Sequence, residues 1–152
     1  MVFKCLDFEE KALDYVKNEV EKIEDKKKRF LSIEYIQKNI IDVIKHRNLK
    51  IKPKDLIYAS GLFDYLPDRV ASKLINYLFK LLNNKGNLII CNVSLENSSH
   101  RAYYEMLGGW NMFHRTKEQM FNLAKEIRNA SEIYFRNPHN CDKYLFLCIR
   151  KK

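Results

Sequence analysis

Short apolar runs alternate along this chain with stretches in which apolar residues recur every three or four positions. Runs of the first kind are typical of buried strands, and they occur at 2–6, 30–36, 56–59 and 87–93. The second pattern is typical of amphipathic helices and occurs at 8–25, 40–44, 67–82 and 116–129. Two further strand patterns, 131–136 and 143–150, flank a turn-rich segment and predict a final antiparallel hairpin.

Residues that favour helix ends support these boundaries. Asp7 with Glu10, and Thr116 with Gln119, have the spacing of a capping box, in which two side chains bond to the first backbone amides of a helix. Pro67 suits the first turn of the 67–82 helix, and the segment 83–86 should end that helix. Asp7 therefore has a structural interpretation as a helix N-cap.

Alternating strands and helices predict an α/β fold with a mainly parallel sheet, closed by the antiparallel hairpin, in a single domain over residues 1–152. The 56–59 and 87–93 strands are uniformly apolar, so we expect both faces of each to be covered. Ligands in such sheets bind beyond the carboxyl ends of the strands. This rule directs attention to the residues that follow each strand, which are Asp7, Asn39, 60–64 and Asn92.

Composition narrows the class of protein. The 152 residues carry 28 Lys and Arg against 19 Asp and Glu, a formal charge of +9, and 46% are hydrophobic, which is enough for a packed core. No run is long and apolar enough to span a membrane, and the charged segment Met1 to Glu10 is unlike a signal peptide, so we expect a cytoplasmic protein without a membrane partner. Basic clusters at 26–29 and 45–54 fall at predicted helix ends, where solvated cations are ordinary, and nucleic-acid binding is not the expected function.

The four cysteines are interpreted as structural. Cys5, Cys91 and Cys148 each lie in an apolar run, and Cys141 is seven residues from Cys148, so no pair has the spacing of a zinc site. A free thiol in an apolar run behaves as a small buried hydrophobe. We therefore expect no metal site.

One group of segments resembles a known family. The run Asp55 to Leu66, with its Gly61-Leu-Phe-Asp-Tyr-Leu66 portion, and the later segments 81–86, 88–92, Trp110 and 114–116 look like the later part of a bacterial class I S-adenosylmethionine-dependent methyltransferase. The resemblance covers nearly the whole chain. It implies a Rossmann-like methyltransferase sheet, S-adenosylmethionine as cofactor and S-adenosylhomocysteine as product.

The resemblance also implies cofactor-binding positions. Asp7 would accept hydrogen bonds from the ribose hydroxyls, and Phe8 would pack on the adenosine. Asn39 and Ile40, after the next strand, would flank the adenine. The loop Ser60, Gly61 and Leu62 would run under the methionine part of the cofactor.

The chain departs from the family pattern at its start. Such methyltransferases begin with a central strand and a Gly-rich turn, whereas the first glycine here is Gly61. The sequence therefore predicts an incomplete domain that lacks the first strand and its helix. Three explanations stay open: a segment lost or supplied by another chain, direct pairing of the 2–6 strand with the 56–59 strand, or strand exchange in a homo-oligomer. We expect a truncated methyltransferase domain, weakly active or inactive alone.

Methyl transfer requires alignment of the methyl group and exclusion of water, with a general base only for a protonated acceptor. Candidate catalytic residues are Asp64, which could instead cap the Pro67 helix, and His114. Candidate substrate-binding residues are Tyr65, Tyr104, Trp110 and Arg115, the last of which could instead pair with Glu105. The sequence does not name the methyl acceptor. The alternative function is a non-catalytic α/β module that binds nucleic acid or a protein through its basic helix ends.

Overall fold

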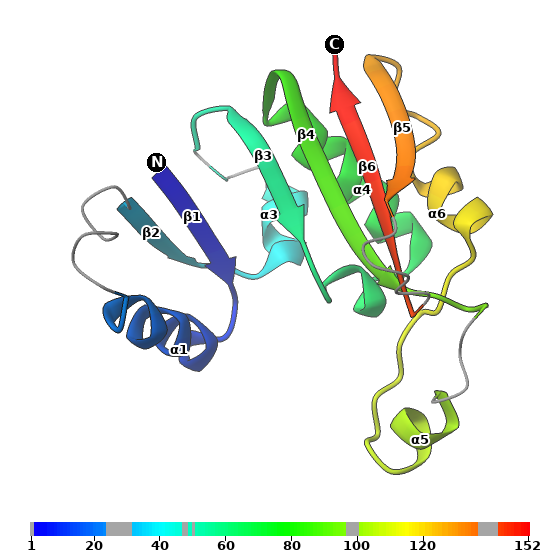
Figure 1. The fold of residues 1–152 in the computed structure, drawn as a ribbon, viewed down its shortest axis with the longest axis horizontal. Helices are drawn as coiled ribbons and strands as arrows, with labels where there is room; N and C mark the ends of the chain where they lie inside the picture. Colours follow the sequence, from blue (N-terminus) through cyan, green and yellow to red (C-terminus); the bar gives the residue numbers. More distant parts are fainter. Residues whose placement is uncertain (1, 24–31, 47–48, 50, 97–100, 137–142) are drawn as a thin grey trace. The chain divides into compact units, whose positions relative to one another are not determined.

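The structure, a computed structural model, describes residues 2–23, 32–46, 49, 51–96, 101–136 and 143–152 (Figure 1). The basic cluster 26–29 and Cys141 lie outside the described residues. Contacts within the chain divide it into two compact units, residues 1–50 and 51–152, and each is described by itself. In the described residues, no helix is both long and apolar enough to cross a membrane.

The first unit contains a two-stranded parallel sheet. β1 (Val2–Asp7) is followed by α1 (Glu10–Glu21), β2 (Ser32–Gln37) and α3 (Ile40–His46). β1 and β2 pair in register from Val2 with Ser32 to Asp7 with Gln37, as expected for a strand, helix, strand unit. Lys4 and Glu34, opposite each other in this ladder, form an ion pair.

The start of α1 differs from the predicted capping box. Glu9 is the N-cap residue, and no side chain bonds to the first helical amides. Asp7 instead accepts a hydrogen bond from the backbone N–H of Glu9, at 2.9 Å, which is the local turn that Asp side chains favour. The prediction that Asp7 caps this helix is therefore wrong, because the chain turns for two more residues before the helix begins.

The second unit contains a four-stranded mixed sheet in the order β3-β4-β6-β5 (Figure 1). β3 (Lys54–Ala59) is parallel to β4 (Leu82–Val93), and β6 (Tyr144–Lys151) is antiparallel to both β4 and β5 (Ala130–Arg136). The helical elements between the strands are η1 (Phe63–Tyr65), α4 (Asp68–Lys80), α5 (Arg101–Met106) and α6 (Lys117–Leu123). The predicted α/β architecture and C-terminal antiparallel hairpin are confirmed, although the sheet of this unit is mixed rather than mainly parallel.

The core of this unit lies between the sheet and α4. Leu74 and Ile75 of α4 are fully buried, as are Leu88 and Ile90 of β4 and Ile149 of β6. The helix buries this stripe because its apolar residues recur at helical spacing. α6 lies beside α4, where the Ser72 hydroxyl donates to the carbonyl of Leu123 at 2.9 Å. The predicted capping box of α6 is confirmed, since Thr116 and Gln119 bond reciprocally.

β4 begins five residues earlier than predicted. The segment 83–86, expected to be only a turn, continues the strand that starts at Leu82, and a register shift accommodates it against β3. Gly86 permits this close approach, because a Cβ there would lie 2.9 Å from the Asn83 carbonyl oxygen and 3.0 Å from that of Lys54.

β1 and β3 belong to separate sheets among the described strands. β1 pairs with β2, and β3 pairs with β4, so the structure does not show the direct pairing of the 2–6 and 56–59 strands. The expectation of two covered faces holds at the end of β4, where the consecutive residues Ile90 and Cys91 point to opposite faces and are both buried, but the second unit by itself does not meet it for β3. Leu56 and Tyr58 of β3 are 56% and 55% exposed, so the elements of the second unit leave that face of the strand uncovered.

Candidate functional site

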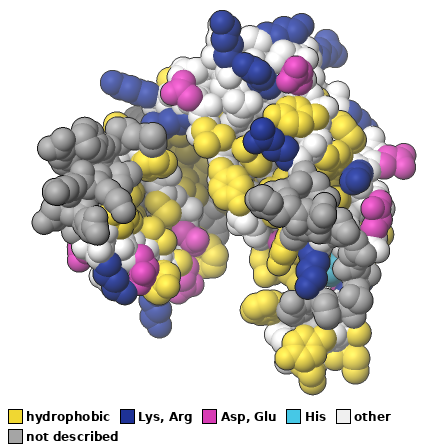
Figure 2. All heavy atoms as spheres, viewed as in Figure 1, with side chains coloured by type: hydrophobic (Ala, Val, Ile, Leu, Met, Phe, Trp, Pro, Cys, Tyr) yellow, Lys and Arg dark blue, Asp and Glu magenta, His cyan; other side chains and the backbone are white. Residues whose placement is uncertain are grey.

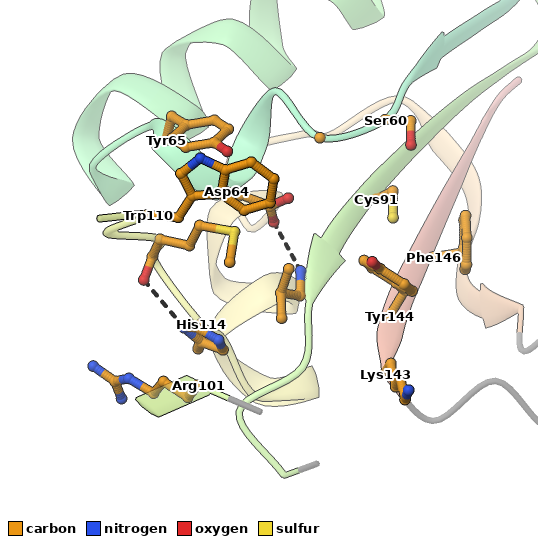
Figure 3. A pocket seen from close by; sticks show the side chains of 13 residues that line it. Ser60, Asp64, Tyr65, Cys91, Arg101, Trp110, His114, Lys143, Tyr144 and Phe146 are labelled. Carbon is orange, nitrogen blue, oxygen red and sulfur yellow. Dashed lines mark hydrogen bonds between the residues drawn. The ribbon is translucent and has the colours of Figure 1, made fainter. Parts of the chain in front are cut away.

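A cavity of about 390 Å³ lies at the end of the four-stranded sheet where β3 and β4 finish and β6 begins (Figure 3). Its walls come from the turn after β3, from η1, from β4 and β6, from α5 and from the segment after α5. The lining residues are Ser60, Gly61, Asp64, Tyr65, Cys91, Val93, Arg101, Trp110, Met112, His114, Lys143, Tyr144 and Phe146. This is the edge at which ligands of parallel α/β sheets bind.

The turn after β3 depends on Gly61. Its φ is +74°, in the left-handed region that residues with a Cβ rarely adopt. The backbone therefore reverses directly after Ala59 and brings Ser60 and Gly61 onto the cavity wall. Leu62, the third residue predicted here, is half-buried and is not part of the lining.

Arg115 organises the base of the site from a buried position, with 2% of its surface exposed. Its Nε and Nη2 donate to the Asp68 carboxylate at 3.0 and 2.8 Å. Nη1 donates to the Phe63 carbonyl at 2.8 Å and to the Asn92 side chain, and Nη2 donates to the Leu66 carbonyl. These five bonds match the five N–H groups of a guanidinium.

The predicted role of Arg115 in substrate binding is therefore corrected. With every N–H donated to the protein, the side chain has no donor left for a substrate anion in this arrangement. Its ionic partner is Asp68 rather than Glu105, which pairs with Arg101. Arg115 instead joins η1, the start of α4 and the end of β4.

Asp64 is buried, with 4% of its surface exposed, and bonds to the end of β4 and to the segment after α5. Its carboxylate accepts the backbone N–H of Val93 at 2.8 Å, and its carbonyl accepts the N–H of Phe113 at 2.7 Å. Desolvation by burial raises the pKa of Asp64, although the Val93 hydrogen bond and Arg115 lower it in part. Asp64 does not cap the Pro67 helix, since no side chain caps α4.

His114 faces the cavity with a defined tautomer. Its Nδ1 lies 3.1 Å from the carbonyl oxygen of Met112. A carbonyl can only accept, so Nδ1 is the donor in this contact, and Nε2 is the ring nitrogen left for other partners. Figure 3 shows this contact on the wall below Trp110.

Aromatic side chains form much of the remaining wall. Tyr65 and Trp110 lie beside each other on one side of the cavity, and Tyr144 and Phe146 of β6 lie on the other (Figure 3). Trp110 follows α5, around which hydrophobic side chains are exposed at the bottom of Figure 2. Tyr65 and Trp110, predicted as substrate-binding residues, both line this cavity. The side chain of Tyr104 lies outside the described atoms.

The remaining predicted cofactor residues belong to the first unit. Asp7 is the last residue of β1 and Phe8 follows it, with a side chain that is 65% exposed. Asn39 and Ile40 follow β2, where the Asn39 side chain accepts the N–H of Ile41 at 2.8 Å. These residues lie at the carboxyl ends of their parallel strands, as predicted.

Sequence reasoning missed several residues of the cavity. Lys143, Tyr144 and Phe146 enter it because the antiparallel β6 starts at the edge where β4 ends. Arg101 enters on α5, a helix that the pattern did not predict. Asn92, which the sequence places at a strand end, does not line the cavity. It is fully buried, and its amide donates to the Phe113 carbonyl at 2.8 Å.

Comparison with known proteins identifies the fold. No protein-family model and no curated protein sequence matches the chain. Similar solved structures include an O-methyltransferase family protein from Burkholderia thailandensis, with a TM-score of 0.74 and 14% identity over 98% of this chain and 43% of that one. Magnesium protoporphyrin IX methyltransferase from Synechocystis, with bound S-adenosylhomocysteine, gives 0.63 and 11% over 98% and 63%. An N-methyltransferase from Bradyrhizobium japonicum, in complex with S-adenosylhomocysteine, gives 0.61 and 13% over 97% and 65%.

The chain therefore has a Rossmann-like methyltransferase fold, shared with solved methyltransferases of which two hold S-adenosylhomocysteine. It spans less than two thirds of each of their lengths, from 43% to 65%.

Proposed function

We propose that residues 1–152 are part of an S-adenosylmethionine-dependent methyltransferase, and that the cavity of the second unit is where the methyl group meets its acceptor. The observation that carries this proposal is the position of the cavity, at the carboxyl ends of β3 and β4 in a fold shared with methyltransferase structures that hold S-adenosylhomocysteine. Its aromatic walls suit a site from which water must be excluded.

The residues present fit such a cofactor at several points. In the first unit, Asp7 uses one carboxylate oxygen for Glu9, and the other would accept the ribose hydroxyls. The exposed ring of Phe8 would pack on the adenosine, and Asn39 and Ile40 would flank the adenine. In the second unit, Ser60, Gly61 and Leu62 would hold the methionine part, where the positive φ of Gly61 brings the backbone to the cavity wall.

When bound, the cofactor supplies an electrophilic methyl group on a sulfonium sulfur. A protonated acceptor would also have to lose its proton when it receives the methyl group. His114 would take that proton at Nε2, since Nδ1 is committed to Met112. Asp64 would act beside it as a buried acid or base, while Tyr65 and Trp110 would contact the acceptor.

The proposal includes low turnover by residues 1–152 alone. Among the described strands, β1 and β3 are each hydrogen-bonded to a neighbour on one side only, and similar methyltransferase structures contain more chain than this one. An alignment error of about 1 Å can cost roughly a hundredfold in rate, so an incompletely supported methionine site would bind more readily than it would react.

Titration calorimetry of the purified chain with S-adenosylmethionine tests the proposal. We expect measurable binding that Asp7→Ala weakens about tenfold to a hundredfold, the scale of losing charge-assisted hydrogen bonds. Asp14→Ala is the matched control, because Asp14 is an exposed acid on α1 of the same unit. Equal affinity in both variants would remove Asp7 from the site, and absence of binding at millimolar cofactor would contradict the proposed function.

A further inference from the structure

The less exposed side chains of the cavity lining are mostly apolar. Cys91 is buried, and Val93, Met112 and Phe146 are half-buried. Asp64 is also buried there, but its carboxylate already accepts the backbone N–H of Val93 at 2.8 Å. A charged ligand group would lose its hydration against such a wall, whereas an apolar group gains from leaving water. The inner part of the cavity therefore suits the apolar body of a ligand.

The exposed side chains of the lining include three aromatic rings. Tyr65, Trp110 and Tyr144 all line the cavity and are all exposed. Tyr65 and Trp110 lie on one side of the cavity, and Tyr144 lies on the other (Figure 3). Aromatic rings pack favourably against a further ring in offset or edge-to-face arrangements. Rings on two sides of one cavity therefore suit a flat, conjugated molecule.

Two cations accompany these rings. Arg101 of α5 and Lys143, next to the start of β6, are exposed lining residues, and both lie toward the lower end of the site in Figure 3. Arg101 donates from Nε to Glu105 at 2.7 Å, a bond that does not use the N–H groups of its two Nη atoms. Among the lining residues that the structure describes, the exposed ones include these cations and no acid. The outer part of the cavity therefore favours an anionic group.

We propose that the methyl acceptor is a small planar aromatic acid, with its ring between the aromatic side chains and its carboxylate at the exposed end beside Arg101 and Lys143. This inference rests on the proposed function and names the substrate class of the same site. The cavity of about 390 Å³ is at the small end of ligand sites, and the cofactor would occupy part of it, so the acceptor has about one or two rings. All lining residues belong to the second unit, so the argument does not involve the first.

Two related classes of ligand fit less well. A flexible aliphatic acid would reach the same cations, but it would lose more conformational freedom on binding and would not stack on the rings. A neutral aromatic molecule would stack on the rings but would gain nothing from Arg101 and Lys143. Cinnamate, octanoate and cinnamyl alcohol represent the three classes, and the first and last differ only in the charged group.

The single tryptophan of the chain provides a readout within the cavity, because Trp110 is a lining residue. Its indole N–H gives one signal in a proton–nitrogen correlation NMR spectrum of the intact chain. This signal is followed while each of the three probes is added, with and without S-adenosylhomocysteine. We expect saturable shifts with cinnamate, at an affinity about threefold to tenfold above that of cinnamyl alcohol at low salt, and weaker binding of octanoate. Added salt should reduce the difference between acid and alcohol, because it screens exposed charges.

Variants separate the two parts of the argument. Lys143→Gln should weaken cinnamate about twofold to fivefold and leave cinnamyl alcohol unchanged, the scale of one exposed charge. Lys117→Gln is the matched control, because Lys117 is an exposed lysine of the same unit outside the lining. Tyr144→Ala should weaken both aromatic probes, whereas Tyr134→Ala, at an exposed tyrosine outside the lining, should weaken neither. Circular dichroism confirms that each variant is folded.

Several outcomes would overturn the inference. These are equal affinities for cinnamate and cinnamyl alcohol, tighter binding of octanoate than of cinnamate, equal effects of Lys143→Gln and Lys117→Gln, or no shift of the Trp110 signal by any probe. Calorimetry with S-adenosylmethionine keeps the two proposals distinguishable. A chain that binds the cofactor but none of the probes would contradict the substrate class alone. A chain that binds cinnamate as expected but no cofactor would retain an aromatic-acid site and contradict the methyltransferase function.

Discussion

Replacing Arg115 by Met should destabilise the second unit more than any surface substitution. The change keeps a long apolar stem but removes all five hydrogen bonds of the guanidinium. Three of the acceptors, the carbonyls of Phe63 and Leu66 and the Asn92 side chain, belong to residues that are at most 5% exposed. Water cannot replace the lost donors at these places without opening the structure.

The magnitude follows from those three acceptors. A buried polar atom without a partner costs about 1 to 3 kcal/mol, and partial relaxation reduces the total, so we expect a loss of about 3 to 5 kcal/mol. Asp68 adds little, because its side chain is 70% exposed and regains water. This loss is a large part of the stability of a typical domain, which is about 5 to 15 kcal/mol.

Urea unfolding measures this loss. Trp110 is the single tryptophan of the chain and belongs to the second unit, so its fluorescence reports on that unit. With a slope of about 1 to 3 kcal/mol per molar urea, the midpoint should fall by about 1 M or more. Arg69→Met is the matched control, because Arg69 is exposed on α4, and it should change stability by less than about 0.5 kcal/mol. Equal midpoints for the two variants would refute the structural role assigned to Arg115.

Three further outcomes are expected from the same unfolding assay. Gly86→Ala should cost about 1 to 3 kcal/mol, because the added Cβ meets backbone oxygens at 2.9 and 3.0 Å; an unchanged midpoint would mean that β3 and β4 are not so close. Thr116→Ala should cost about 0.5 to 2 kcal/mol through loss of the α6 cap, whereas the exposed Lys117→Ala should not. Burial raises the pKa of Asp64 above its ordinary 3.8, so between these two pKa values the folded chain keeps a proton that the unfolded chain releases. The wild type should therefore lose stability relative to Asp64→Asn as pH rises through that window, and the opposite slope would contradict the burial argument.

Local patterns in the sequence determined the elements of this protein. Helical spacing of apolar residues located α1, α3, α4 and α6, and the Thr116 capping box was readable because its two partners are three residues apart. Apolar runs located the strands, and the alternation of strands and helices was sufficient for the fold class. The position of the site at the carboxyl end of the sheet follows from that class, so Ser60, Gly61 and Trp110 could be proposed before their geometry was known.

Tertiary structure decided the roles of the polar residues. Arg115 bonds to groups 23 to 52 residues away in the chain, and no local pattern distinguishes such a buried cation from one that binds substrate. Asp64 was undecided for the same reason, since its partner Val93 is 29 residues distant. The exposure of Leu56 and Tyr58 was also hidden, because an apolar run specifies a strand that ought to be covered, while only the assembled sheet shows which of its faces and edges has a neighbour.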